Sequence, residues 1–315
     1  MKILVTGASG LVGSALCCRL VRQGLTVLGA VRTLPDKITA GVDYRIVPDL
    51  GSETNWSEVL AGVNVVVHCA ARMDVMQDTV DDPLMAFREV NVEGTVRLAK
   101  QAIDRKLKRF IYISSLKVNG EYTEDYPFTA GDVPMPTAPY SISKWEAEQS
   151  LKNIAEGTDL EVVIIRPPLI YGPGVRDNFL LLLKLVKLGL PLPLGAIENR
   201  KSLVGLDNLV DLIVTCLNHN AAANQTFLVS DGEDLSTPEL LRRMAVAMKR
   251  PARLIAIPVP LLVKLAGLLG KEGFAFRLCS SLQADISKTQ ELLGWSPPVS
   301  VDESLQKNTD HFMSL

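Results

Sequence analysis

The first thirteen residues combine a short apolar run with a glycine-rich turn, and this combination constrains the fold more than any other feature. Residues 1–13 read MKILVTGASGLVG, in which Gly7, Gly10 and Gly13 have the spacing G-x-x-G-x-x-G. The first glycine allows a sharp turn, the second lets the backbone approach a pyrophosphate, and the third lets a helix pack closely on a sheet. The start of such a helix attracts phosphates through unpaired N–H groups and a partial positive charge. The segment therefore predicts a strand, a turn and a helix that bind a dinucleotide.

Strand-length apolar runs alternate with helix-length amphipathic stretches through the first half of the chain. The apolar runs are rich in Val and Ile, as expected for strands buried on both faces. They cover residues 3–6, 26–30, 44–48, 65–68, 110–114 and 161–166. Helical patterns cover residues 12–22, 85–105 and 141–156. Repeated β-α units predict an α/β fold, with a parallel sheet covered by helices on both sides and right-handed crossovers.

Beyond residue 166 the alternation lapses and prolines accumulate, which indicates a second structural unit. A helical pattern at 208–217 and a short strand at 226–229 can return to the main sheet. From residue 232 onwards the chain has the pattern of helices joined by proline-rich turns. The expected division is residues 1–170 with 203–231 for the sheet domain, and 171–202 with 232–315 for a smaller, discontinuous substrate-binding lobe.

The composition excludes several classes of protein. The chain has 315 residues, a formal net charge of −2 and 47% hydrophobic residues, close to an average soluble globular protein. No run of Lys and Arg could replace phosphate counterions, so a nucleic-acid partner is not expected. The two most apolar stretches, residues 179–194 and 254–270, are interrupted by lysines or prolines, so neither predicts a membrane span.

The N-terminus and the cysteines favour a cytoplasmic protein. Gly7 interrupts the first apolar run, unlike the apolar core of a signal peptide. The five cysteines are odd in number and lack metal-ligand spacing, and the three histidines are scattered. We therefore expect reduced thiols, no metal site and a cytoplasmic location.

The end of the second strand distinguishes between the two nicotinamide dinucleotides. An NAD-binding domain usually presents a carboxylate there for the ribose 2′-hydroxyl, but this chain has Val31 followed by Arg32. A 2′-phosphate is then not repelled, and a guanidinium can bind it with parallel hydrogen bonds. The pattern favours NADP(H) over NAD(H). The alternative is that Arg32 is a solvated surface charge beside NAD(H).

Five further motifs follow in order along the chain. They are VVHCAA at 66–71, NVEGT at 91–95, YISS at 112–115, YSISK at 140–144 and RPPLIYGPG at 166–174. Together with the glycine turn they resemble, almost end to end, the extended short-chain dehydrogenase/reductases, and within them the nucleotide-sugar epimerase/dehydratase group. The resemblance implies a Rossmann-type doubly wound parallel sheet and an NAD(P)-dependent oxidoreductase acting on a UDP-sugar.

The most specific motif places Tyr140 and Lys144 one helical turn apart, behind the strand end that carries Ser115. Tyrosine has a pKa near 10, and lowering it by about three units requires roughly 4 kcal/mol of phenolate stabilisation. Lys144, at i+4, lies on the same helix face and can supply the positive charge. In the family this lysine also binds the nicotinamide ribose, and the tyrosine exchanges a proton with the substrate oxygen. Ser115 aligns with the family's Ser/Thr that hydrogen-bonds the same oxygen.

The same resemblance implies the other cofactor contacts. The residues of the turn should hold the diphosphate: Gly7, Ser9, Gly10, Leu11, Val12 and Gly13. Residues at later strand and helix ends should line the adenine, the adenosine and diphosphate path, and the nicotinamide half: Asp49, Leu50, Cys69, Ala70, Ala71, Asn91, Ser114 and Pro167. His68 and Cys69 lie at a buried strand end, where packing is a sufficient role, and neither is assigned to catalysis.

The segment after Ser115 distinguishes among the activities of the group. In the related 4,6-dehydratases an Asp-Glu pair at this point serves as acid and base at carbons 5 and 6 of the sugar. Here Leu116 and Lys117 occupy those positions and cannot replace two carboxylates. Dehydration is therefore not expected, and Lys117 becomes a candidate substrate contact instead.

Reduction and epimerisation at C4 of the sugar remain as alternatives. An epimerase holds its cofactor through both half-reactions, whereas a reductase exchanges oxidised for reduced cofactor in every cycle. The segment SLKVNGE resembles a subgroup with bacterial 4-ketoreductases that make UDP-N-acetylquinovosamine for polysaccharide biosynthesis, and this subgroup is also labelled UDP-glucose 4-epimerase. Arg32 favours reduction of a UDP-4-keto-6-deoxyhexosamine. The alternative is a UDP-glucose or UDP-N-acetylglucosamine 4-epimerase.

The resemblance also implies contacts in the second lobe. Arg200 matches an arginine that contacts the nucleotide diphosphate, Arg277 is the expected second arginine, and Asn178 aligns with a phosphate-contacting asparagine. Paired guanidiniums suit two phosphates, although each of the three could be a solvated surface residue. The helices at 85–105 and 141–156 occupy the places where relatives dimerise, so a homodimer is expected.

Two rival functions remain open. A nucleotide-sensing or scaffold protein without activity would lack Tyr140, Lys144 or Ser115, and all three are present. A reductase of non-nucleotide ketones, of the dihydroflavonol-reductase-like kind, shares an arginine at the end of the second strand, but would not need Arg200 and Arg277.

Overall fold

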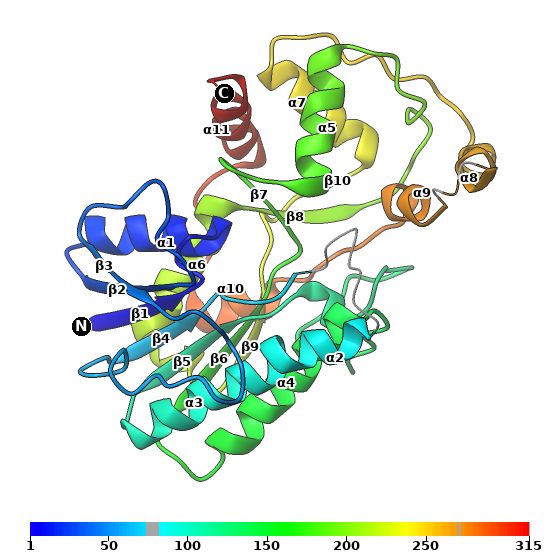
Figure 1. The fold of residues 1–315 in the computed structure, drawn as a ribbon. Coiled ribbons are helices and arrows are strands. Elements are labelled where there is room, and N and C mark those ends of the chain that lie inside the picture. Colours follow the sequence, from blue (N-terminus) through cyan, green and yellow to red (C-terminus); the bar gives the residue numbers. More distant parts are fainter. Residues whose placement is uncertain (74–81, 269, 271, 315) are drawn as a thin grey trace.

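Seven parallel strands form the central sheet of the computed structural model, which describes residues 1–73, 82–268, 270 and 272–314 (Figure 1). In spatial order they are β3 (Val42–Ile46), β2 (Thr26–Val31), β1 (Lys2–Thr6), β4 (Val65–His68), β5 (Arg109–Ile113), β6 (Glu161–Arg166) and β9 (Thr226–Leu228). Ile3 of β1, for example, pairs with Val27 on one side and Val65 on the other, both in parallel. The strand order reverses between β1 and β4. In doubly wound sheets ligands bind at the carboxyl ends of the strands beside such a reversal.

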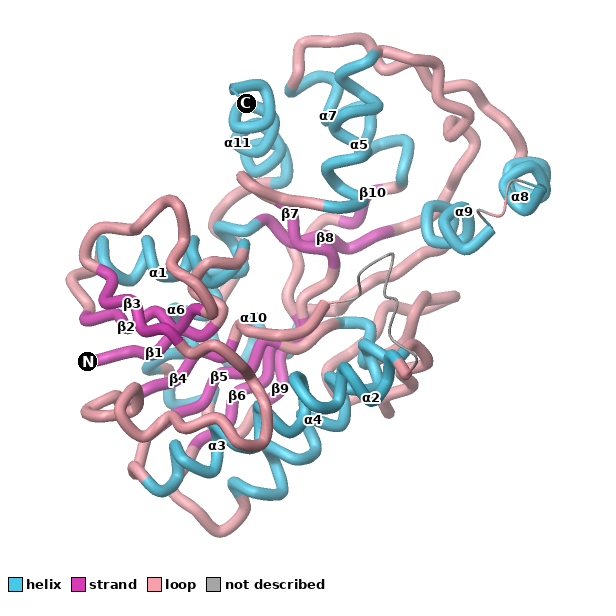
Figure 2. The backbone as a smooth tube through the Cα atoms, in the orientation of Figure 1, coloured by secondary structure: helices cyan, strands magenta, loops and turns pink. Residues whose placement is uncertain are grey.

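The strands bury side chains on both faces of the sheet because their side chains alternate in direction. In β5, Phe110 packs in one buried cluster and Ile111 in the other. The helices of one face are α1 (Leu11–Arg22) and α6 (Leu206–Asn218), and those of the other face are α3 (Gly94–Asp104) and α4 (Pro139–Ala155) (Figure 1, Figure 2). The predicted α/β fold with a doubly wound parallel sheet is therefore confirmed.

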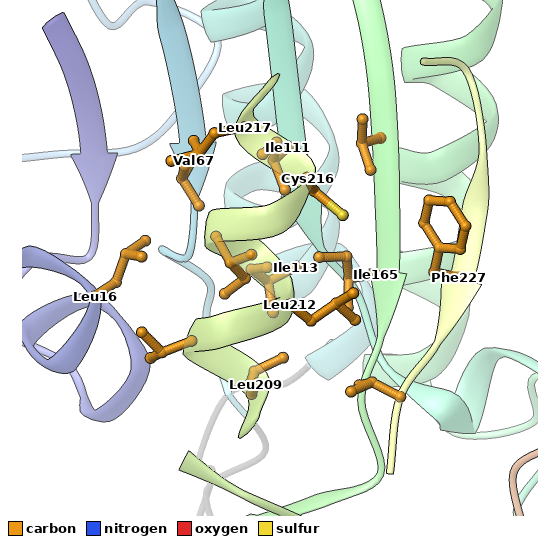
Figure 3. Packing of buried hydrophobic residues seen from close by; sticks show 14 of the residues in the cluster. Leu16, Val67, Ile111, Ile113, Ile165, Leu209, Leu212, Cys216, Leu217 and Phe227 are labelled. Atoms are coloured by element: carbon orange, nitrogen blue, oxygen red, sulfur yellow. The ribbon is translucent and has the colours of Figure 1, made fainter. Parts of the chain in front are cut away.

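Figure 3 shows how α6 completes the first of these clusters. Leu209 and Leu212 of α6 are fully buried beside Ile113 and Ile165 of the sheet. Burying one such side chain is worth about 1.5–3 kcal/mol, so this helix is held firmly although it follows a strand of the second lobe in sequence. The helical pattern at 208–217 thus returns to the main sheet as predicted.

The second lobe is built on a three-stranded sheet of β10 (Asp234–Leu235), β8 (Lys201–Gly205) and β7 (Leu169–Tyr171). Its helices are α5 (Asp177–Leu188), α7 (Thr237–Ala247), α8 (Val259–Leu268), α9 (Glu272–Cys279) and α11 (Val301–Ser314). Tyr171, Phe179 and Leu203 are among the residues of its own buried cluster. Because β7 begins three residues after the end of β6, the lobe lies next to the carboxyl edge of the main sheet. None of the helices in the described part of the chain is long and apolar enough to cross a membrane.

Two predicted elements differ from those found. The strand expected at 44–48 is β3 at 42–46, an edge strand whose weak apolar pattern marks its ends poorly. The helix expected at 85–105 consists of α2 (Pro83–Arg88), a π-helical turn (Glu89–Glu93) and α3. The π turn shifts the helical register by one residue, and the pattern over the whole range does not locate that shift; such turns are frequent at functional sites.

Candidate functional site

The turn between β1 and α1 leaves its backbone open at the carboxyl edge of the sheet. Gly7 has φ +63°, and a Cβ at this residue would lie 2.9 Å from backbone atoms of Ala70. A Cβ on Gly13 would lie only 2.2 Å from the carbonyl oxygen of Gly7. Gly10 is the N-cap of α1, and both it and Ser9 are exposed. The turn therefore stays tight and presents the first N–H groups of α1 as a cradle that fits a diphosphate.

The other residues predicted for the diphosphate path lie around this cradle. Leu11 and Val12 form the first turn of α1 and are half-buried. Cys69 and Ala71, also half-buried, flank Ala70 after the end of β4. Burial raises the pKa of the Cys69 thiol, so this cysteine stays protonated and inert.

Three residues predicted for the adenosine end lie along the same edge of the sheet. Arg32 directly follows β2 and is exposed. Asp49 is exposed and Leu50 is half-buried. The backbone of Leu50 lies close to the start of α3, since a Cβ on Gly94 would be 3.1 Å from the Leu50 carbonyl carbon. The fold thus brings the ends of β2 and β3 toward the glycine turn, with the Arg32 guanidinium open to solvent.

A directional chain of hydrogen bonds passes through the buried His68 at the end of β4. The hydroxyl of Thr95 donates to the Asn91 carbonyl at 2.7 Å, and so it accepts from Nε2–H of His68 at 3.0 Å. The unprotonated Nδ1 then accepts from the Thr6 hydroxyl at 2.7 Å, and this hydroxyl accepts from the N–H of Ala70 at 3.1 Å. Burial lowers the pKa of His68 to about 3, so the ring stays neutral. His68 thereby ties the backbone beside the glycine turn to the π turn.

Asn91, within that π turn, holds the loop that follows Ala71. Its Oδ1 accepts from the N–H of Arg72 at 2.8 Å, and its Nδ2 donates to the Arg72 carbonyl at 3.1 Å and to the Ser143 hydroxyl at 3.0 Å. The side chain is buried, and its donors are used by protein groups. Asn91 therefore holds the backbone of Arg72 against α4 and does not present a free amide.

The three predicted catalytic residues lie on two neighbouring segments, the stretch that follows β5 and the helix α4. Nζ of Lys144 donates to the carbonyl of Ile113 at 2.6 Å, two residues before Ser115. Tyr140 lies in the first turn of α4, one turn before Lys144, and its half-buried ring lies edge-on to Phe87 at 6.0 Å between centroids. The structure thus places the backbone two residues before Ser115 against the α4 residue Lys144, with Tyr140 one turn earlier on that helix.

The environment of Lys144 adjusts its charge. The side chain is 2% exposed, and Nζ lies 4.1 Å from the centroid of the Tyr112 ring. Burial lowers the pKa of Lys144 to about 7, and the negative charge of Glu148 opposes this shift. A lysine with such a pKa changes its protonation state close to neutral pH.

Glu148 belongs to a buried ion pair that the sequence motifs did not indicate. Nε and Nη2 of Arg166 donate to its two oxygens at 3.0 and 2.6 Å, and the two side chains are 2% and 0% exposed. Nη1 of Arg166 also donates to Asn119 at 2.9 Å, and the Ser114 hydroxyl donates to Glu148. Ser114, predicted as a cofactor contact, therefore directs its hydroxyl into this pair.

The sequence held one signal for the role of Glu148. Its spacing of four residues from Lys144 places both side chains on one helix face.

The segment after Ser115 forms a short turn of helix, Leu116–Val118. Leu116 is fully buried, and its N–H donates to the Pro167 carbonyl at 2.8 Å, which fixes Pro167 beside the site. Nζ of Lys117 lies 3.0 Å from Glu121, whose other carboxylate oxygen accepts from Ser141 at 3.2 Å. No acidic pair stands at 116 and 117, as a dehydratase would need.

Lys201, at the start of β8, is a cation near the site that the motifs did not select. Its Nζ donates to the carbonyl of Arg277 at 2.8 Å. Burial lowers the pKa of Lys201 to about 8, and the positive charge of Lys117 lowers it further. Arg200, Arg277 and Asn178 are all exposed.

Comparisons with known proteins agree with this arrangement. The sequence pattern described as "NAD dependent epimerase/dehydratase family" matches residues 3–230. A UDP-glucose 4-epimerase from Vibrio cholerae is 46% identical over 315 residues, which cover 99% of this chain and 95% of that protein. A 2-alkyl-3-oxoalkanoate reductase from Stenotrophomonas maltophilia is 29% identical over 330 residues, which cover 98% of each chain.

A solved structure shows the same fold. The UDP-glucuronic acid 4-epimerase of Bacillus cereus, in complex with UDP-glucuronic acid and NAD, is similar with a TM-score of 0.81 at 23% identity. The similarity covers 100% of this chain and 99% of that one. It extends through both the sheet domain and the lobe.

Proposed function

Because the chain belongs to the NAD dependent epimerase/dehydratase family, we propose that it is a UDP-hexose 4-epimerase that keeps its cofactor through both half-reactions. The observation that carries this proposal is the 46% identity, over nearly the whole length, to the Vibrio cholerae UDP-glucose 4-epimerase. The motifs alone favoured reduction of a UDP-4-keto-6-deoxyhexosamine. The relative supports the alternative, epimerisation, better.

The residues at the carboxyl edge fit a nicotinamide dinucleotide. The turn of Gly7, Gly10 and Gly13 is too tight for a Cβ at Gly7 or Gly13, and its exposed start of α1 can receive a diphosphate. Lys144 would hold the nicotinamide ribose, and Pro167 would lie near the carboxamide. A nicotinamide dinucleotide held there would supply the hydride acceptor and donor for C4 of the sugar.

The chain's own groups move the proton. Tyr140 accepts the proton of the C4 hydroxyl and gives it back in the second half-reaction. Ser115 hydrogen-bonds the same oxygen and keeps it in place. Lys144, in its charged form, stabilises the phenolate of Tyr140 through its positive charge. Glu148, one turn further along α4, favours that charged form.

We assign the diphosphate of the UDP-sugar to the lobe side of the site. Lys117, whose ammonium lies 3.0 Å from a Glu121 oxygen, and Lys201, at the start of β8, are cations that can contribute to holding this diphosphate. Arg200, Arg277 and Asn178 are exposed residues that can add contacts at the rim.

A second candidate is reduction of a 4-keto UDP-sugar with NADPH. It is favoured by Arg32, an exposed guanidinium directly after β2 where NAD-binding domains usually carry a carboxylate. In this case the cofactor would be released and replaced in every cycle.

The two functions are separated by one set of assays. The purified chain is incubated with UDP-galactose and with UDP-N-acetylglucosamine without added reductant, and the products are separated chromatographically. It is also incubated with UDP-4-keto-6-deoxy-N-acetylglucosamine and NADPH, whose absorbance is followed. Interconversion of a UDP-sugar with its C4 epimer without net NADPH consumption supports the epimerase. Stoichiometric NADPH consumption with the keto sugar, and no interconversion of the other two UDP-sugars, refutes it.

Tyr140→Phe provides the internal check. It should abolish turnover and leave dinucleotide binding intact, because it removes the transferable proton and keeps the ring. Tyr126→Phe, at a tyrosine that is 82% exposed, is the matched control and should behave as wild type.

A further inference from the structure

The chain passes five times between the main sheet and the lobe, because helix α10 (Ser287–Leu293) returns to the sheet before α11 begins. Leu293 belongs to the same buried cluster as residues of α1 and α6. The five passages cover residues 167–168, 205–206, 229–233, 280–286 and 294–300. Four of them converge on the side chain of Asp231, a buried carboxylate in the third passage.

Three donors from other elements surround the carboxylate of Asp231. Its Oδ1 accepts from the N–H of Gly205 and from Nδ2 of Asn208, each at 2.7 Å. Gly205 is the last residue of β8 and the N-cap of α6, so it lies in the second passage. The Oδ2 atom of Asp231 accepts from the hydroxyl of Tyr171 at 2.8 Å. Tyr171 is fully buried and ends β7, the strand that follows the first passage.

The last passage is held by the same side chains. Asn208 donates to the carbonyl of Val299 at 2.8 Å and accepts from its N–H at 2.9 Å. The hydroxyl of Tyr171 lies 3.4 Å from the carbonyl of Val301, where α11 begins. Asp231, Asn208 and Tyr171 therefore form one buried node that joins β7, β8, α6 and the start of α11.

The opposite end of β8 is attached through the fourth passage. The N–H of Ser202 donates to the carbonyl of Leu282 at 2.9 Å. The N–H of Thr123, in the segment between β5 and α4, donates to the carbonyl of Ser281 at 2.9 Å. At about 3.3 Å per residue, the attachments of β8 at Ser202 and Gly205 lie about 10 Å apart. Two attachments fix the direction of the strand, and loss of one lets the lobe turn about the other.

We propose that Asp231 is a positioning residue, which through the node sets the orientation of the lobe and thereby the place of the sugar's C4 relative to Tyr140. This inference rests on the proposed function, in which the lobe holds the diphosphate and the sheet domain carries the reacting groups. A shift of about 1 Å at one end of a lever about 10 Å long turns the lobe by about 6°. A misplacement of about 1 Å at the reacting atoms can lower turnover by on the order of 10²-fold.

Asp231→Ala tests the node, because it deprives three donors of their buried acceptor. We expect kcat to fall by on the order of ten- to a hundredfold. The dissociation constants of NAD and of UDP, each measured by titration calorimetry, should stay close to the wild-type values. Each of these ligands is held mainly by one side of the site, whereas turnover needs both sides in register.

Asp231→Asn is the conservative variant and should restore most of kcat. Oδ1 of the amide still accepts from Gly205 and Asn208, and its Nδ2 can donate to the hydroxyl oxygen of Tyr171. The hydroxyl proton of Tyr171 then turns to the carbonyl of Val301.

Asp211→Ala is the matched control. Asp211 lies on α6 and accepts from Arg19 and from the indole of Trp295, at 3.1 Å each. Both partners belong to the sheet domain, since Arg19 is on α1 and Trp295 lies in the buried cluster of the sheet. This variant loses hydrogen bonds of the same kind but none to the lobe, so its kcat should equal that of the wild type.

Urea unfolding gives a readout that does not depend on turnover. The three tryptophans, Trp56, Trp145 and Trp295, all lie in the sheet domain. Their fluorescence therefore reports the unfolding of that domain, whereas circular dichroism reports both parts of the chain. Asp231→Ala should widen the gap between the two midpoints, because the lobe loses its coupling to the sheet. Asp211→Ala should move both midpoints together.

Three results would overturn the proposal. They are equal kcat values in Asp231→Ala and Asp211→Ala, a loss of NAD binding as large as the loss of kcat, and equal losses in Asp231→Ala and Asp231→Asn. If Asp231→Ala does not fold, Tyr171→Phe replaces it and deletes a single hydroxyl of the node. Wild-type kcat in that variant, with an unchanged gap between the midpoints, would refute the role of the node.

The positioning role and the proposed function can fail separately. If the wild-type chain reduces the keto sugar with NADPH and does not interconvert the other UDP-sugars, the epimerase is refuted. The variants are then compared on the reduction, for which C4 must reach the same place. The urea midpoints test the node in either case.

Discussion

Replacing Glu148 with glutamine tests whether the ion pair behind Lys144 governs both stability and charge. The substitution keeps the shape of the side chain and leaves the guanidinium of Arg166, 2% exposed, without its anion. Breaking a buried pair from one side costs about 3–5 kcal/mol of unfolding free energy. Two charge-assisted hydrogen bonds, at 3.0 and 2.6 Å, are weakened together. Urea denaturation followed by circular dichroism measures the loss.

The same substitution should act on the reaction through Lys144. Without the anion, burial lowers the pKa of Lys144 below its present value of about 7. The ammonium that stabilises the Tyr140 phenolate is then lost at lower pH, so the alkaline limb of the kcat profile should move to lower pH. KM for the UDP-sugar should change little, because Glu148 is fully buried and does not contact substrate.

Two variants separate the two effects. In Glu148→Gln with Arg166→Met no unpaired charge remains, so most of the stability should return, while the kcat profile stays displaced. Glu146→Gln, on the same helix, breaks an exposed pair with Arg88 and should cost about 0–1 kcal/mol. If Glu148→Gln is no more destabilising than Glu146→Gln, or if the double variant restores the pH profile together with stability, the reasoning is wrong.

Three other substitutions test the cofactor edge. Gly13→Ala should destabilise the fold by about 1–3 kcal/mol, because the new Cβ would lie 2.2 Å from the Gly7 carbonyl oxygen. It should also abolish the thermal stabilisation of the chain by NAD. Gly51→Ala is the control, since a Cβ there meets nothing within 4 Å. His68 has a pKa of about 3 in the folded chain and about 6.5 in the unfolded chain. The unfolded chain therefore binds more protons than the folded chain between these two pH values. The free energy of unfolding should fall by about 1.4 kcal/mol per pH unit as the pH drops from 6.5 toward 3. His68→Asn should remove that part of the slope in urea titrations at successive pH values. Arg32→Asp should weaken NADPH more than NADH in binding titrations, and an equal loss for both would show that Arg32 does not read the 2′-phosphate.

Local patterns predicted most of the sheet domain and less of the site. The glycine turn and each apolar run depend only on residues adjacent in sequence, so the sequence alone indicates the strand, the turn and the helix. Lys201 could not be chosen over Arg200 from the motif, because only the fold shows that Lys201 is half-buried and bonded to the Arg277 carbonyl, whereas Arg200 is exposed. The contact between Arg166 and Glu148 joins residues from β6 and α4 and follows from the packing of the helix on the sheet. The division into two domains and the homodimer stay predictions.

The neutrality of His68 and the charge of Lys144 depend on each other. Burial is the main cause of the low pKa of His68, and the positive charge of Lys144 lowers this pKa further. A protonated His68 would in turn place a second cation beside Lys144, and like charges would push the pKa of Lys144 further below 7. The chain of hydrogen bonds from Ala70 to Asn91 excludes this, because it uses Nδ1 of His68 as an acceptor and leaves no site for a second proton. Glu148 acts on Lys144 from the other side and favours the ammonium. The charge of Lys144, one helical turn after Tyr140, is thus set near neutral pH by a neutral ring on one strand and an anion on the same helix.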